Sequence, residues 1–173
     1  MISVFRKLFG LENEPPAGPD SDTETVRRIV REVDSMDPAE ARYIAAFAFV
    51  LSRVARADMV ISDEETQRME EVVRDVGGLE EAQAILVVQI AKSQQSLMGG
   101  TENYLVTREF NKIADREQKE RLLRCLFEVS AADDSISLIE ENEARLIAEE
   151  LRFEHREFSA IRAEFNEKRS ILR

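Results

Sequence analysis

A pattern of nine residues, Ala-Asp-x-x-Ile-Ser-x-x-Glu, occurs twice in this chain and constrains its fold more than any other feature. The first copy begins at Ala57 and the second at Ala132, an offset of 75 residues (132 − 57). Apolar residues at helical spacing flank both copies in matching positions. A duplicated helical hairpin explains this arrangement. We therefore expect an all-α fold, a single-domain helical bundle of about seven helices with two pseudo-symmetric helix-turn-helix units.

The length and composition agree with one helical domain. A chain of 173 residues suffices for one domain with a hydrophobic core. Hydrophobic residues make up 43% and charged residues 34%, with only six Gly and four Pro, which favours helices. Three of the prolines fall within residues 12–22. We predict an amphipathic tail over residues 1–11, a Pro-rich linker over 12–22 and the helical domain over 23–173.

Cap residues and apolar spacing predict where the helices begin and end. Asp37, followed by Pro38 and by Glu40 three residues after the cap, is a strong helix start. The expected helices cover about residues 22–35, 37–57, 62–77, 80–97, a stretch containing 104–113, 115–132, 137–151 and 154–168. No strand is expected.

Each copy of the motif contains a capping box. Ser62 and Ser137 are expected N-caps, and the glutamates three residues later reach back to the cap backbone. Asp58 and Asp133 fit less easily, because each stands at a helix end that prefers a cation. Either these aspartates accept N–H groups of their own turns, or they converge on a hard cation such as calcium or magnesium. EF-hand spacing fails, since the sixth residue from Asp58 is Asp63 rather than Gly.

The negative charge is concentrated around the two motifs. The whole chain carries −11, whereas residues 58–81 and 128–150 carry −7 each, so the remainder carries +3. Such a balance excludes sequence-independent nucleic-acid binding, which needs a basic face. A cation or a basic protein surface is the partner that acidic turns favour.

The first residues form a short amphipathic segment. Ile2, Phe5 and Phe9 share one helical face, with Arg6 and Lys7 beside them. This tail is expected either to contact a membrane peripherally or to pack on its own domain or on a dimer mate. No apolar run is long enough to span a bilayer, and the N-terminus lacks a signal peptide. We expect a cytoplasmic protein, peripheral at the inner face of the membrane if the tail binds there.

Residues that usually reveal catalysis are scarce. Cys125 lies in an apolar run and is expected to be a buried, inert thiol. His155 is the only histidine, and its place near a helix start favours an exposed or capping role over a base. No phosphate-binding Gly loop and no CxxC pair occur. We predict no enzymatic activity, no catalytic residue and no cofactor other than a divalent cation.

The doubled motif, with Phe110, Asn111 and Asp115 between its copies, resembles the TerB-like, tellurite-resistance family over about residues 39–168. The resemblance implies a bacterial, cytoplasmic, all-helical domain associated with tellurite resistance and stress responses, with an acidic metal site. The ligand positions that it implies here are Asp58, Glu65, Asp133 and Glu140. The chain departs from the family at Met59 and Asp134, where glycine is common, which puts the turn geometry in doubt. The absence of a His-Pro-Asp triplet implies the stand-alone form rather than a J-domain fusion.

Overall fold

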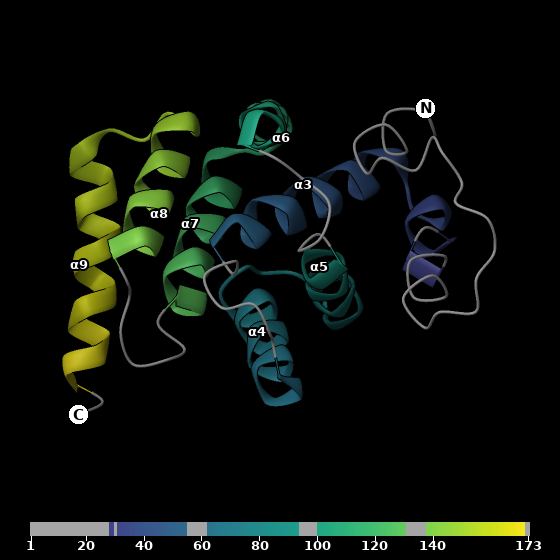
Figure 1. The fold of residues 1–173 in the computed structure, drawn as a ribbon, viewed down its shortest axis with the longest axis horizontal. Helices are drawn as coiled ribbons and strands as arrows, with labels where there is room; N and C mark the ends of the chain where they lie inside the picture. Colours follow the sequence, from purple (N-terminus) through teal and green to yellow (C-terminus); the bar gives the residue numbers. More distant parts are fainter. Residues whose placement is uncertain (1–27, 30, 55–61, 94–99, 131–137, 172–173) are drawn as a thin grey trace.

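The computed structural model describes residues 28–29, 31–54, 62–93, 100–130 and 138–171 (Figure 1). These residues are helical apart from short caps and turns, and no strand occurs among them, as the sequence predicted. Residues 28–29 and 31–35 are helical and bury Ile29 and Val33. The remaining helices are α3 (Pro38–Val54), α4 (Asp63–Asp75), α5 (Glu81–Ser93), α6 (Gly100–Ile113), α7 (Arg116–Ser130), α8 (Leu138–Glu150) and α9 (His155–Ile171).

Helix α3 is the centre of the bundle. It contacts α5, α6, α7 and α8, and Figure 1 shows it passing through the middle of the molecule. Every residue from Ile44 to Val54 is buried, so this helix is surrounded rather than amphipathic. Phe47 and Phe49 are among the largest fully buried side chains. Each stabilises the fold by about 1.5–3 kcal/mol through the apolar area it removes from water.

The bounds of α4 and α8 differ by the same number of residues as the two copies of the motif. The first residues are 63 and 138 and the last are 75 and 150, so both pairs differ by 75. Buried Met69 and Val73 in α4 match buried Ala144 and Ala148 in α8 at the same offset. These correspondences concern positions along the chain. The pseudo-symmetric arrangement of the two halves in space stays a prediction.

The expected start of α3 is confirmed. The Asp37 side chain accepts the N–H of Ala39 at 2.9 Å, so α3 begins at Pro38 as predicted. The Glu40 carboxylate accepts a hydrogen bond from the Gln83 amide at 2.6 Å. This side chain ties α3 to α5, a contact that local spacing does not reveal.

Positive φ angles mark the ends of two helices. Gly78 has φ 69° after α4, and a Cβ there would lie 1.9 Å from Nη1 of Arg121. Arg152 has φ 64° after α8 and is the one non-glycine residue of the described part with positive φ. Both residues end a helix through a left-handed turn. The sequence predicted the first of these ends from its glycine pair, but the second has no glycine.

Some predictions lie outside the described residues. The predicted tail and linker, 1–11 and 12–22, are among them, so the domain boundaries stay predictions. The same holds for the predicted ends of the helices at 57, 97 and 132. Helix α9 ends at Ile171, three residues beyond the predicted end at 168. No helix of the described part is both long enough and apolar enough to cross a membrane.

Candidate functional site

The first copy of the motif starts α4 with the predicted capping box. The Ser62 hydroxyl accepts the Glu65 N–H at 3.2 Å, and the Glu65 carboxylate accepts the Ser62 N–H at 2.5 Å. Hydrogen bonds from Ser62 to the carboxyl group hold the pKa of Glu65 below its ordinary value of 4.5, and the backbone N–H of Ser62 contributes most. Glu65 is therefore ionised at neutral pH, and one of its oxygens is already engaged by the helix end.

The second copy is described only in part. Glu140 is the third residue of α8, the position that Glu65 occupies in α4. Asp58, Asp133 and Ser137 lie outside the described residues, as do Met59 and Asp134. Among the side chains that are described, no group of three or more His, Cys, Asp or Glu residues is arranged to hold a metal ion. The four-carboxylate cation site therefore stays a prediction.

The last turn of α3, which precedes the first motif in the sequence, carries a buried positive charge that the sequence did not predict. The Arg53 side chain is only 2% exposed. Its Nε donates to Glu143 at 2.7 Å, and its Nη1 donates to Glu150 and to Thr107, each at 2.6 Å. The two carboxylates come from α8 and the fully buried Thr107 comes from α6. This Arg53 cluster joins three helices at one point.

The chemistry of the Arg53 cluster is structural. Four donated bonds, including a longer one from Nη2 to Glu150 at 3.4 Å, satisfy most of the guanidinium. A buried charge of this kind is tolerated only when partners and hydrogen bonds compensate its lost hydration. The sequence signal was an arginine at the end of an apolar helix. Its partners, 90 and 97 residues away, could not be read from spacing.

A shallow groove between α4 and α5 is the second feature that the sequence did not reveal. Its volume is about 170 Å³. Ala84 is buried and Ile85 is half-buried, so the groove has an apolar base, while three glutamates flank it. We call this the α4/α5 groove, and its lining residues are Gln67, Glu70, Glu71, Arg74, Glu81, Ala84 and Ile85.

The arginine of the α4/α5 groove pairs with an aspartate and offsets the glutamates only in part. Arg74 donates from Nε to Oδ1 of Asp75 at 2.7 Å and from Nη2 to Oδ2 at 3.2 Å. This pairing raises the pKa of Arg74 and lowers that of Asp75. Arg74 is also attracted to Glu71 and Glu81, but one arginine against three glutamates leaves the groove with an excess of negative charge.

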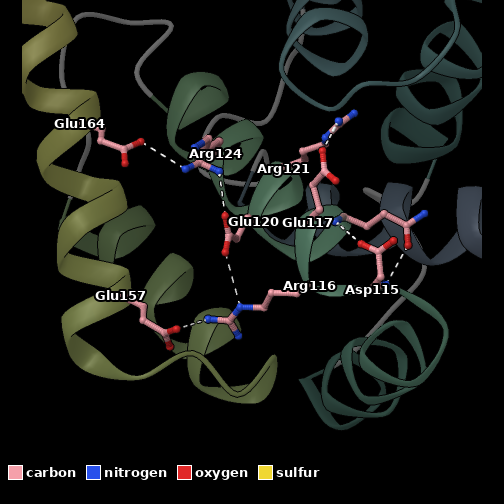
Figure 2. A network of polar contacts seen from close by, with 9 residues as sticks. Asp115, Arg116, Glu117, Glu120, Arg121, Arg124, Glu157 and Glu164 are labelled. Carbon is pink, nitrogen blue, oxygen red and sulfur yellow. Dashed lines mark hydrogen bonds and ion pairs between the residues drawn. The ribbon is translucent and has the colours of Figure 1, made fainter.

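On the other side of the molecule, ion pairs hold α9 against α7. Figure 2 shows Arg116 and Arg124 of α7 pointing toward Glu157 and Glu164 of α9, with Glu120 between the two arginines. The Arg116 guanidinium also lies 3.9 Å from the ring centre of Phe153. All of these charged side chains are at least one-third exposed, so the network is a surface feature that orients α9.

The segment between the two motifs has structural roles. Phe110 is fully buried, with its ring 5.5 Å from Tyr43 and 6.2 Å from Phe47. The Asp115 side chain caps α7 by accepting the Gln118 N–H at 2.8 Å, and the Gln118 side-chain oxygen accepts the Asp115 N–H at the same distance. The Asn111 side-chain oxygen is buried and has no hydrogen-bond partner among the described residues.

The residues considered for catalysis are not arranged as a reactive site. Cys125 is fully buried, as predicted, and burial raises the pKa of its thiol above the ordinary range. Burial likewise raises the pKa of Tyr43 to about 12, with smaller contributions from Cys125 and Asp115. His155 is exposed at the first residue of α9, while Glu154 and Glu157 form the cap there.

The described structure defines a class of protein: an all-helical bundle whose distinctive sequence is an acidic helix-turn-helix motif. A family model described as "Tellurite resistance protein TerB" matches residues 43–163, which is more than half of the chain. This chain therefore belongs to the TerB family, and the resemblance inferred from the doubled motif is confirmed. No curated protein and no solved structure matches it.

Proposed function

We propose that this TerB-family chain is a non-enzymatic binding module that acts in tellurite resistance and related stress responses, and that it binds a partner protein with a basic surface. The observation that carries the proposal is the acidic face of α4. Six of its 13 residues are Asp or Glu and two are Arg, so the helix carries −4. Complementary charge steers such a partner and fixes its orientation.

The α4/α5 groove gives this face a place for docking. Glu71 and Glu81 are exposed on either side of the groove, on different helices, and Ile85 offers apolar contact between them. A partner segment with basic residues around an apolar anchor would match both properties. We propose a cytoplasmic location for this encounter, which agrees with a chain whose one cysteine is a buried free thiol.

The experiment is a test of tellurite tolerance in a strain that lacks the gene. Complementation with Glu71→Lys/Glu81→Lys should fail to restore tolerance, because both substitutions reverse the charge of the groove. The control, Glu32→Lys/Glu149→Lys, makes the same change in net charge at two exposed residues outside the groove and should restore it. Unaltered tolerance in the deletion strain, or full complementation by the groove variant, would overturn the proposal.

Cation binding is a second candidate for the same turns. The four positions that match the family, Asp58, Glu65, Asp133 and Glu140, supply the hard oxygen ligands that calcium or magnesium prefers. Glu65 would have to share its carboxylate between the cation and the Ser62 N–H. Because carboxylates have two oxygens, the second oxygen remains for a ligand role.

A further inference from the structure

From the α4/α5 groove and the tail sequence, we infer that residues 1–11 of this same chain are the regulatory occupant of the groove. The tail would cover the acidic face and compete with the basic partner. The inference deepens the proposed function, because it names a regulator of the surface on which that function rests. Three arguments support it: the chemistry of the groove, the chemistry of the tail and the reach of the connecting chain.

The size and lining of the groove suit a peptide rather than a metabolite. Its volume of about 170 Å³ is well below the roughly 300–1,000 Å³ that is usual for small-molecule sites. Half-buried Ile85 supplies most of the exposed apolar surface, because Ala84 is almost fully buried, and Glu70, Glu71 and Glu81 supply negative charge around it. Arg74 also lines the groove, but it pairs with Asp75 and is outnumbered by the three glutamates.

The tail has the complementary pattern. If it is helical, Ile2, Phe5 and Phe9 form one apolar face, and Arg6 and Lys7 lie beside that face. An amphipathic helix binds a groove through apolar anchors at this spacing. The aromatic anchors match the apolar base, and the two cations match the three glutamates.

Another exposed apolar surface is a poorer match for the tail. Tyr104 and Leu105 on α6 are 51% and 49% exposed. The same helix carries two glutamates, one arginine and one lysine, so its net charge is zero. It therefore offers the cations of the tail no excess of negative charge. Charge therefore selects the α4/α5 groove over α6.

The connecting chain is long enough to permit this docking. Residues 12–27 number 16 and can span at most about 55 Å when extended. A domain of this size has a radius of gyration of about 15 Å, so every face lies within reach. Because the tail and the groove belong to one chain, docking is intramolecular, which raises the effective concentration of the tail and compensates a weak intrinsic affinity.

The test uses the full chain carrying Ser3→Cys with a nitroxide spin label on the new thiol. Cys125 is fully buried, so wild-type protein treated identically controls for unwanted labelling. Paramagnetic broadening of backbone amides should be strongest in α4 and α5 and weak in α9. Broadening centred on α6 or α9, or no broadening of any helix, would overturn the inference.

Charge reversal makes the test specific. Arg6→Glu/Lys7→Glu should abolish the broadening of α4 and α5, as should Glu71→Lys/Glu81→Lys. The two pairs combined should restore it, because the charges again complement each other. If all four proteins broaden alike, the charges do not direct docking and the inference fails.

Anionic vesicles test the alternative that the tail binds a membrane. If the tail is a membrane tether, residues 1–11 will be required for sedimentation with phosphatidylserine vesicles, and no helix will be broadened without lipid; that combination contradicts self-docking. None of these measurements needs the partner. Broadening of α4 and α5 with tellurite tolerance independent of the groove would uphold this inference and reject the proposed function.

Discussion

Arg53 places a full positive charge inside the bundle, where water cannot hydrate it. Its neutralisation depends on Glu143 and Glu150 from α8 and on the hydroxyl of Thr107. Replacing a buried ion pair by apolar groups is often neutral for stability, whereas removing one partner is not. The residue therefore specifies which helices meet more than it adds net free energy.

Arg53→Ala should lower the free energy of unfolding by about 3–5 kcal/mol, because it leaves Glu150, 10% exposed, without its cation. Denaturant unfolding measures this. Arg68→Ala, at an exposed residue of α4, is the control and should change stability by less than about 0.5 kcal/mol. Equal effects of the two substitutions would show that the Arg53 cluster is not compensating a buried charge.

The capping bond of Glu65 makes its contribution to stability depend on pH. Its folded-state pKa is lowered by hydrogen bonds from Ser62, so its contribution to stability is present at neutral pH and lost as the pH falls below about 4.5. Glu65→Gln should therefore be less stable than wild type at pH 7, and the difference should shrink in acid. Unfolding curves across pH measure it, with Glu64→Gln, an exposed neighbour outside the capping box, as control. A difference between wild type and Glu65→Gln that grows in acid would contradict the assignment.

Among the elements, α9 shows two kinds of attachment side by side. Its charged residues pair with α7 at the surface (Figure 2), while Phe158, Ile161 and Phe165 are buried beneath. The Phe165 ring stacks 5.9 Å from Phe127. Exposed ion pairs add little to stability and are screened by salt. The apolar face of α9 therefore supplies most of the free energy that holds this helix on the bundle.

Phe165→Ala should therefore lower the free energy of unfolding by about 3 kcal/mol at any salt concentration, through loss of apolar contact and a residual cavity. Glu157→Gln/Glu164→Gln should cause a small loss at low ionic strength that disappears near 1 M salt, where the Debye length is about 3 Å. Thermal unfolding at both salt concentrations separates the two. A larger loss for the charge variant than for Phe165→Ala would mean that ion pairs hold this helix.

At the scale of the whole molecule, the uneven charge directs what the chain can bind. Two windows of −7 within a chain of −11 concentrate the field around the two motifs. A field of this kind raises the local concentration of cations and basic partners. This negative field supports both the cation proposal and the partner proposal, so each proposal needs its own measurement.

Calorimetric titration with calcium, magnesium and manganese tests the cation proposal. Wild-type protein should release or absorb heat with at least one of these ions. Asp58→Asn and Asp133→Asn should weaken that binding, because each removes a proposed ligand. Identical null titrations for all three proteins would reject the cation site. The carboxylates would then serve only as acceptors within their own turns.

What the sequence by itself determined was local or periodic. Helix starts at Asp37 and Ser62, the all-α class and family membership followed from cap chemistry, apolar spacing and the doubled motif, since these depend on residues within a few turns of one another. Only the tertiary structure decided the partners of Arg53, the bond from Gln83 to Glu40 and the α4/α5 groove. The hydrogen bonds of Arg53 and Gln83 join residues 43 to 97 positions apart, and these bonds and the groove alike depend on how the helices pack rather than on sequence spacing.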